Sequence, residues 1–172
     1  MKKGLAHDVA VINYRNINAI VGDSISVGGQ RGLICTGKIN NGETIFRHTG
    51  PILSERTWLT VQVGHNAHLE VGELGRHTNH SCNPNARVST KIHEDGTATV
   101  SLIAVRDISQ EEVCFDYATT ETNVTAGLRR AECLCGSANC RGHIFGFYEL
   151  SESERKRLQK AGLLAEHLSC FE

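Results

Sequence analysis

Long apolar runs, an excess of one charge and proline are all scarce in this sequence. No apolar run approaches the roughly 20 residues of a membrane-spanning helix, so we expect no membrane partner. Eighteen Lys and Arg against 19 Asp and Glu give a net charge of −1, which offers no electrostatic support for direct nucleic-acid binding. Two prolines beside 17 glycines indicate many turns and a fold rich in β-strands.

The sequence shows no internal repeat and no low-complexity linker, and we expect no secretory signal. The basic start at residues 1–4 leads into polar residues rather than an apolar segment, so we expect an intracellular protein of the cytoplasm or nucleus. A chain of 172 residues is long enough for one domain with its own core. We divide it into supporting strands (1–24), a main domain (25–120), a connecting and cysteine-rich segment (121–143) and a helical tail (144–172).

Short β-branched or alternating runs predict strands throughout the first two thirds of the chain. The predicted strands cover residues 9–12, 19–21, 25–27, 32–35 and 44–46, and a strand is favoured over a helix within 54–71. The dipeptide Asp95-Gly96 between residues 86–92 and 97–105 predicts a hairpin. Residues 118–132 predict a connecting loop that turns helical over 126–131.

The tail carries the pattern of an amphipathic helix. Ser151 and Glu154 have the spacing of a capping box, and apolar residues then recur at near-helical spacing as far as Leu168, with Gly162 as an interruption. We expect this helix to pack on its own domain. A helix that forms a homodimer is the alternative, so the oligomeric state stays open.

Seven cysteines are an odd number, and three of them lie within eight residues. Cys133, Cys135 and Cys140 are too close together for a disulfide framework and favour a metal. Zinc prefers four thiolate or imidazole ligands, and Cys82, in a polar segment, is the candidate for the fourth. Reduced, unliganded thiols are the alternative. Cys35 and Cys114 lie in apolar runs typical of buried cysteine.

Two further patterns are weak alone. The glycine-rich segment 28–32 is either a plain turn or a loop whose backbone lies against a cofactor. The pair Asn79-His80 is either a turn or part of a site, and the run 111–117 ends in Tyr117, a buried aromatic whose hydroxyl needs a partner.

Taken in order, these motifs resemble the SET domain family of protein-lysine methyltransferases. Residues 104–117 look like the last core strands of that domain, and residues 79–85, preceded by Arg76, look like its cofactor signature. The run 133–142 is similar to the post-SET zinc motif. The resemblance spans about residues 27–143. It implies a mainly β SET fold in which two active-site segments pass across each other, with a post-SET zinc segment and a C-terminal helix.

The resemblance also implies a function. It predicts an enzyme that methylates a lysine of a protein or peptide, most commonly a histone tail, with S-adenosylmethionine as donor and a structural zinc. The implied residues are Tyr117 for catalysis, Gln30, Arg31, Gly32, Asn79 and His80 for the cofactor, Phe115 and His48 for the substrate channel, and Cys82, Cys133, Cys135 and Cys140 for zinc. Phe115 leaves room for di- or trimethylation. Glu70, Glu73, Glu111 and Glu112 are candidates to attract a basic peptide.

Three positions depart from the family pattern. Gln30 stands where the family has the first glycine of its cofactor loop, His48 where it has a tyrosine, and His77 where an aromatic follows Arg76. These departures leave two alternatives: a SET-like module that binds a peptide or cofactor without transferring a methyl group, and a small structural zinc protein.

Overall fold

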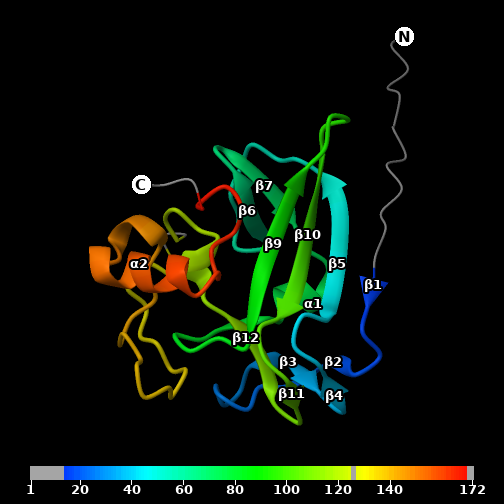
Figure 1. The fold of residues 1–172 in the computed structure, drawn as a ribbon, viewed down its shortest axis with the longest axis vertical. Coiled ribbons are helices and arrows are strands. Elements are labelled where there is room, and N and C mark those ends of the chain that lie inside the picture. The colour runs from blue at the N-terminus through cyan, green and yellow to red at the C-terminus, as the bar shows by residue number, and fades with distance from the viewer. Residues whose placement is uncertain (1–13, 125–126, 170–172) are drawn as a thin grey trace.

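Short strands dominate the computed structural model, which describes residues 14–124 and 127–169 (Figure 1). The strands are β1 (Tyr14–Arg15), β2 (Ala19–Asp23), β3 (Arg31–Cys35), β4 (Lys38–Ile39), β5 (Thr44–Pro51), β6 (Thr60–Gly64), β7 (Ala67–Glu70), β8 (Asn79–His80), β9 (Ala86–Ile92), β10 (Thr97–Ala104), β11 (Ile108–Ser109) and β12 (Glu112–Phe115). The helices are α1 (Glu73–Arg76), the 3₁₀ turns η1 (Tyr117–Thr119) and η2 (Phe147–Glu149), and α2 (Glu152–Lys160).

Two four-stranded sheets form the body of the molecule. One has the order β1-β5-β10-β9 and the other β2-β3-β12-β8, with the small pairs β4·β11 and β6·β7 beside them. The predicted hairpin is confirmed as β9 and β10, which pair in continuous antiparallel register. Its turn forms where Gly96 has a φ of 82° and the Asp95 carboxylate accepts a hydrogen bond from the Thr97 amide.

The parallel pair β8·β12 decides where the site lies. Asn79 pairs with Cys114 and His80 with Phe115, and the Ser81 amide donates to the Phe115 carbonyl at 3.0 Å. Two segments more than 30 residues apart in the sequence therefore lie side by side. The mainly β fold expected from the sequence is confirmed, and so is the meeting of these two segments.

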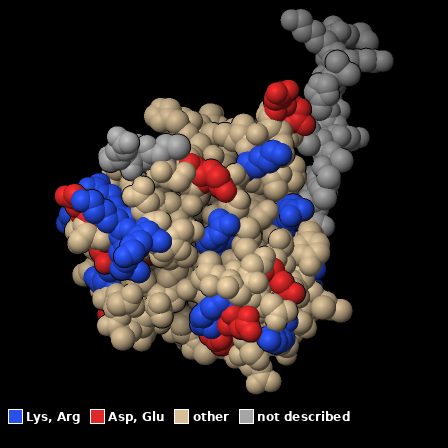
Figure 2. Space-filling model, viewed as in Figure 1, with Lys and Arg blue, Asp and Glu red and all other residues tan. Residues whose placement is uncertain are grey.

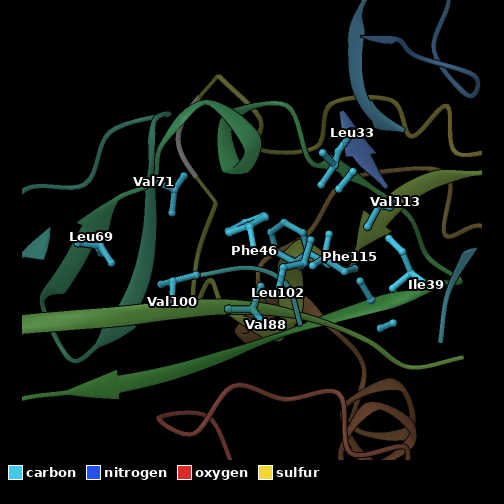
Figure 3. Close-up of a cluster of buried hydrophobic side chains, with 14 of the residues drawn as sticks. Leu33, Ile39, Phe46, Leu69, Val71, Val88, Val100, Leu102, Val113 and Phe115 are labelled. Carbon is cyan, nitrogen blue, oxygen red and sulfur yellow. The ribbon is translucent and has the colours of Figure 1, made fainter. Parts of the chain in front are cut away.

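The main core fills the space between the two sheets (Figure 3). Its buried side chains come from most of the strands and include Leu33, Ile39, Phe46, Leu69, Val88, Val100, Leu102, Val113 and Phe115. Along β9, buried residues alternate with more exposed ones from Ala86 to Thr90, as a strand with one covered face requires. β10, between β5 and β9, is buried at most positions, so both of its faces are largely covered.

A second apolar cluster attaches the C-terminal helix. Leu158 of α2 packs with Phe147, Leu163 and Leu168 against Ala118, so the helix packs on its own domain as expected. The Ser151 hydroxyl caps the helix by accepting from the Glu154 amide. The helix is shorter than the apolar pattern predicted, because the chain turns at Gly162 with a φ of 66°.

Three local predictions need correction or comment. Residues 25–27 do not form a strand, because the amides of Ile25 and Ser26 donate to the Glu112 carboxylate instead of a neighbouring strand. Residues 127–131 form a turn rather than a helix. The strand expected at residues 9–12 lies outside the described residues.

The surface mixes charges of both signs. Figure 2 shows the densest group of Lys and Arg over the α2 side of the molecule, next to acidic side chains. Two of these basic residues are ion-paired within the helix, Lys156 with Glu152 and Arg157 with Glu154. In the described part of the chain, none of the helices has the length and apolar character needed to cross a membrane.

Candidate functional site

Four cysteine sulfurs converge beside the β8·β12 pair. The Sγ atoms of Cys82, Cys133, Cys135 and Cys140 all lie within 4.8 Å of one another, and those of Cys82 and Cys133 are 3.8 Å apart. A tetrahedron with Zn–S bonds of about 2.3 Å places its sulfurs about 3.8 Å apart. The donor set and its spacing therefore fit a structural zinc ion.

The surroundings of the cysteine cluster favour a metal over free thiols. Burial raises the pKa of the Cys82 thiol to about 11, so a metal that binds this sulfur would release its proton. The evidence in favour of a metal is the set of backbone amides that point at the sulfurs. The Gly142 amide donates to Cys140 Sγ and the Arg141 amide to Cys82 Sγ, both at 3.4 Å. Cys35 and Cys114 lie apart from the cluster, buried within strands as expected, and Cys170 lies outside the described residues.

Two pockets meet at Tyr117. One is lined by the apolar residues Leu59, Val61, Val71, Val124 and Leu128 together with Phe115. The other is lined by Gln30, Asn79 and His80 on one side, and by Leu134 and Ile144 of the cysteine-rich segment on the other. Tyr117 and Leu128 line both pockets, so these two residues lie where the pockets adjoin.

The Tyr117 side chain is fixed on three sides. Its hydroxyl donates to the Thr78 carbonyl at 3.1 Å, and its ring lies 5.0 Å from that of Phe115 and 5.2 Å from that of His80. Burial raises the pKa of the phenol, so the group stays neutral at physiological pH. As a neutral phenol, Tyr117 can position a group by accepting a hydrogen bond from it.

Glu112 organises the Asn79 side of the site. Its buried carboxylate accepts hydrogen bonds from the Asn79 side chain at 2.7 Å, from the amides of Ile25 and Ser26, and from the Ser24 hydroxyl. Burial works against the charge, but the hydrogen bonds led by Asn79 lower the pKa of this carboxyl. Glu112 thus holds the segment after β2 against β8.

The predicted glycine-rich loop contributes only in part. Gln30 lines the pocket with Asn79. The Arg31 side chain points away and pairs with Asp23, while the Arg31 carbonyl accepts from Asn79. Gly32 also lies outside the pocket lining. A Cβ there would sit 2.5 Å from the Glu112 carboxylate, so the glycine makes room for Glu112, and the predicted contact of its backbone with a cofactor stays a prediction.

His80 joins the two halves of the site. Its Nδ1 accepts a hydrogen bond from the Tyr117 amide at 3.2 Å, and its Nε2 lies 3.4 Å from Cys82 Sγ. Burial lowers the pKa of His80 to about 4, against the opposing effect of Asp116. The ring is therefore neutral, with its proton on Nε2.

His48 is not placed with Phe115 and Tyr117. It lies on β5 and lines a separate cleft with Leu69 and Gly72, and burial lowers its pKa. Arg76 borders both this cleft and the Tyr117 pocket and pairs with Glu70. His48 therefore lines a cleft next to the pocket of Phe115 and Tyr117, with Arg76 shared between the two, and its role in the substrate channel stays a prediction.

Most of the acidic residues expected to attract a basic peptide are already engaged. Glu111 pairs with Arg106 and Glu70 with Arg76. The Glu112 carboxylate accepts hydrogen bonds from Asn79 and from the Ile25 and Ser26 amides. Glu121 lines the pocket that contains Phe115, and Glu132 lines the one that contains Asn79. The sequence singled out neither.

Glu121 is largely buried beside Arg56. It accepts from the Gln62 amide at 2.8 Å, and its Oε2 lies 3.6 Å from Arg56 Nε. Burial raises the pKa of Glu121 to about 7. Trp58, at the rim of the same pocket, is 81% exposed. In the sequence, Glu121 belongs to the predicted loop 118–132. The mixture of Thr and Glu in that loop is ordinary and gave no sign of a site.

Comparisons with known proteins agree with this geometry. Residues 30–118 match the SET domain family model. A histone H3 lysine-9-specific lysine N-methyltransferase of Schizosaccharomyces pombe is 38% identical, covering 44% of this chain and 18% of its own length. An H3 lysine-36-specific enzyme of Candida albicans is 33% identical, covering 63% of this chain and 15% of its own. This chain thus spans less than a fifth of these relatives.

A solved structure gives an independent comparison. The crystal structure of KRYPTONITE in complex with mCHG DNA and SAH superposes with a TM-score of 0.60 and 22% sequence identity, over 76% of this chain and 30% of that one. This likeness concerns the fold. The family match covers more than half of the chain and includes Asn79, His80, Phe115 and Tyr117, and so the chain belongs to the SET domain family.

Proposed function

We propose that this chain transfers a methyl group from S-adenosylmethionine to the side-chain amine of a protein lysine. The observation that carries the proposal is the meeting of two pockets at the partly buried Tyr117. One contains Phe115 and aliphatic side chains together with Glu121 and is called the apolar pocket below. The other contains Gln30, Asn79 and His80 and is called the polar pocket. Such an arrangement lets two reactants approach one point from opposite sides, and holding them in line supplies much of the catalysis. The family and its histone-lysine methyltransferase relatives support the same chemistry.

Tyr117 would orient the amine. Its hydroxyl proton is committed to the Thr78 carbonyl, so the lone pairs of the oxygen are available to accept a hydrogen bond from the amine. A neutral phenol in this position fixes direction without removing a proton. The amine must be unprotonated to attack, and the apolar pocket wall lowers the pKa of an entering lysine by desolvation.

The polar pocket would hold the methyl donor. Gln30, Asn79 and His80 line it from the β8 side, and Leu134 of the cysteine-rich segment closes it from the other. S-adenosylmethionine, when bound, supplies an electrophilic methyl group. Zinc on the four cysteines would have a structural role. It would hold Leu134 and its neighbours against the pocket.

Phe115 would set the degree of methylation. It lies in the apolar pocket beside Tyr117 and presents no hydroxyl that would hold a water or a partly methylated amine in place. We therefore expect di- or trimethylated product. Mass spectrometry of a modified peptide tests this, and a product that stops at one methyl group contradicts it.

A histone tail is the proposed substrate class. The names of the relatives support it, and the exposed Trp58 and the buried Glu121 at the apolar pocket suit a basic, flexible peptide. Core histones and labelled S-adenosylmethionine provide the test. If the label appears only in proteins other than histones, the proposal of lysine methylation stands but histones are excluded as the substrate.

Calorimetry separates the enzyme from the alternatives. We expect zinc-loaded protein to bind S-adenosylmethionine and its demethylated product, and to transfer label to lysine. Binding without transfer identifies a SET-like binding module. In that case Gln30→Gly, which restores the glycine of the family pattern, is the first variant to test. No binding of either compound leaves a structural zinc protein.

A further inference from the structure

A buried ion pair connects the cysteine-rich segment to the residue before Tyr117. Asp116 is fully buried, and its two carboxylate oxygens lie 2.7 Å from Nη1 and Nη2 of Arg141, which directly follows Cys140. The same carboxylate accepts from the Ala118 amide at 3.1 Å and so caps the 3₁₀ turn that begins at Tyr117. One carboxylate therefore fixes both Arg141 and the start of the Tyr117 turn.

A second connection runs through His80. The Tyr117 amide donates to His80 Nδ1 at 3.2 Å, which leaves the ring proton on Nε2, 3.4 Å from Cys82 Sγ. The Arg141 amide donates to the same sulfur at 3.4 Å. The contacts close a ring that passes from Cys82 through His80 and Tyr117 to Asp116, and back through Arg141 to Cys82.

This ring requires the cysteine-rich segment to be in place. A buried carboxylate that loses its guanidinium partner becomes an uncompensated buried charge, which is strongly destabilising. Both hydrogen bonds to Cys82 Sγ strengthen when the sulfur is a metal-bound thiolate, because a charged acceptor makes the stronger bond. The Sγ atoms of Cys82 and Cys140 lie within 4.8 Å of each other, and this places Arg141 where its side chain reaches Asp116 and, at 3.7 Å, Glu154.

We propose that His80 and Arg141 are positioning residues through which a metal on the four cysteines fixes the backbone of Tyr117. Metal binding and the ordered conformation of the turn at Tyr117 are then thermodynamically linked, so that each favours the other. Loss of the metal releases Arg141, uncovers Asp116 and loosens the turn that carries the tyrosine. The link to methyl transfer rests on the proposed function, but the link between metal and Tyr117 does not.

The test uses Arg141→Lys, which keeps the charge but loses the two-pronged contact with Asp116. We expect the variant to bind zinc and to release it to a chelator about tenfold faster, the usual size of an effect from the groups behind metal ligands. The backbone amide of Tyr117, followed by NMR hydrogen exchange, should lose protection by a similar factor. Asp116→Asn should do the same, and the double variant should add little to either single change.

Arg106→Lys is the matched control. Arg106 and Glu111 also form a two-pronged contact, at 2.8 and 2.6 Å, but that pair is exposed and distant from the cysteines. Zinc release and Tyr117 exchange should stay at wild-type values. Wild-type protein stripped of zinc provides a second measurement that needs no variant: Tyr117 should lose protection while the Val100 amide in β10 keeps it.

The outcomes are distinct. Unchanged Tyr117 exchange in the stripped wild type, or unchanged zinc release in Arg141→Lys, overturns the proposal. Absence of methyl transfer by the wild type refutes the proposed function alone, because zinc release and amide exchange do not depend on turnover. If the proposed function holds, Arg141→Lys should also lower kcat while leaving KM for the lysine peptide near its wild-type value.

Discussion

At the residue scale, Tyr117 is the side chain whose hydroxyl matters most for the proposed reaction. Tyr117→Phe keeps the ring and its contacts with Phe115 and His80 but removes the hydrogen bond to the Thr78 carbonyl. We expect methyl transfer to fall on the order of 100-fold because the amine loses its alignment. The unfolding free energy should fall by only about 1–2 kcal/mol for the unpaired carbonyl.

Tyr14→Phe is the control for that prediction, since Tyr14 is half exposed on β1 and belongs to neither pocket that meets at Tyr117. Single-turnover assays and denaturant titrations of both variants provide the comparison. Wild-type activity in Tyr117→Phe would remove the tyrosine from the mechanism.

Glu121 predicts a pH dependence of stability. Burial raises its pKa to about 7 from an ordinary value of 4.5, so between these pH values the folded chain binds more protons than the unfolded chain. This group therefore contributes stability that is present at low pH and lost as the pH rises through 7. Glu121→Gln cannot ionise and should escape the loss.

The measurable quantity is the difference in unfolding free energy between Glu121→Gln and the wild type. It should shift in favour of the variant by up to about 3 kcal/mol from pH 5 to pH 8. Taking the difference cancels the histidines His48, His68, His80 and His167, whose pKa values are lowered by burial. A constant difference across this range would show that Arg56 keeps the carboxylate charged throughout.

At the element scale, the segment between β2 and β3 depends on the absence of a side chain at Gly32. A Cβ there would meet the Glu112 carboxylate at 2.5 Å, so Gly32→Ala should displace the carboxylate from Asn79. We expect a loss of about 1–3 kcal/mol in stability together with weaker binding of S-adenosylmethionine. Calorimetry and thermal unfolding measure the two effects.

Gly28→Ala is the matched control in the same segment. Nothing lies within 4 Å of a Cβ at Gly28, so stability and cofactor affinity should stay near wild type. Equal effects of the two substitutions would mean that these glycines are needed for the flexibility of the segment rather than to leave space for Glu112.

The elements also show what the sequence could predict. The β9·β10 hairpin was predictable because its turn and both alternating strands are adjacent in the chain. The three-cysteine motif was predictable because metal ligands of one type at short spacing are rare by chance. The role of Glu112 was not, because it depends on the approach of Ser24, Ile25 and Asn79 from two distant segments.

The ion pair of Asp116 and Arg141 escaped prediction for a related reason. Both residue types are usually exposed, and nothing in their local sequence marks them as buried. The placement of His48 followed from a resemblance to the family pattern. The structure places His48 in a cleft that shares Arg76 with the Tyr117 pocket, so its role in the channel stays a prediction. The division of the chain at residues 24, 120 and 143 remains a prediction.

At the scale of the whole molecule, the C-terminal segment supports the chain that follows Tyr117. The Ala165 amide donates to the Thr119 carbonyl at 2.9 Å, and His167 Nε2 lies 2.8 Å from the Thr120 carbonyl. Leu168 is buried in the cluster that includes Ala118. Thus residues near the end of the chain pack directly behind the site.

Leu168→Ala should therefore affect more than local packing. Removing a buried leucine side chain costs about 2–5 kcal/mol, and here the cavity forms next to Ala118, one residue from Tyr117. We expect lower stability by denaturant titration and, under conditions where the variant is fully folded, weaker methyl transfer. Ile17→Ala, at a side chain that is 87% exposed, should change neither. Full activity in folded Leu168→Ala would show that the C-terminal cluster stabilises the molecule without shaping the site, because the cavity would then leave the Tyr117 turn in place.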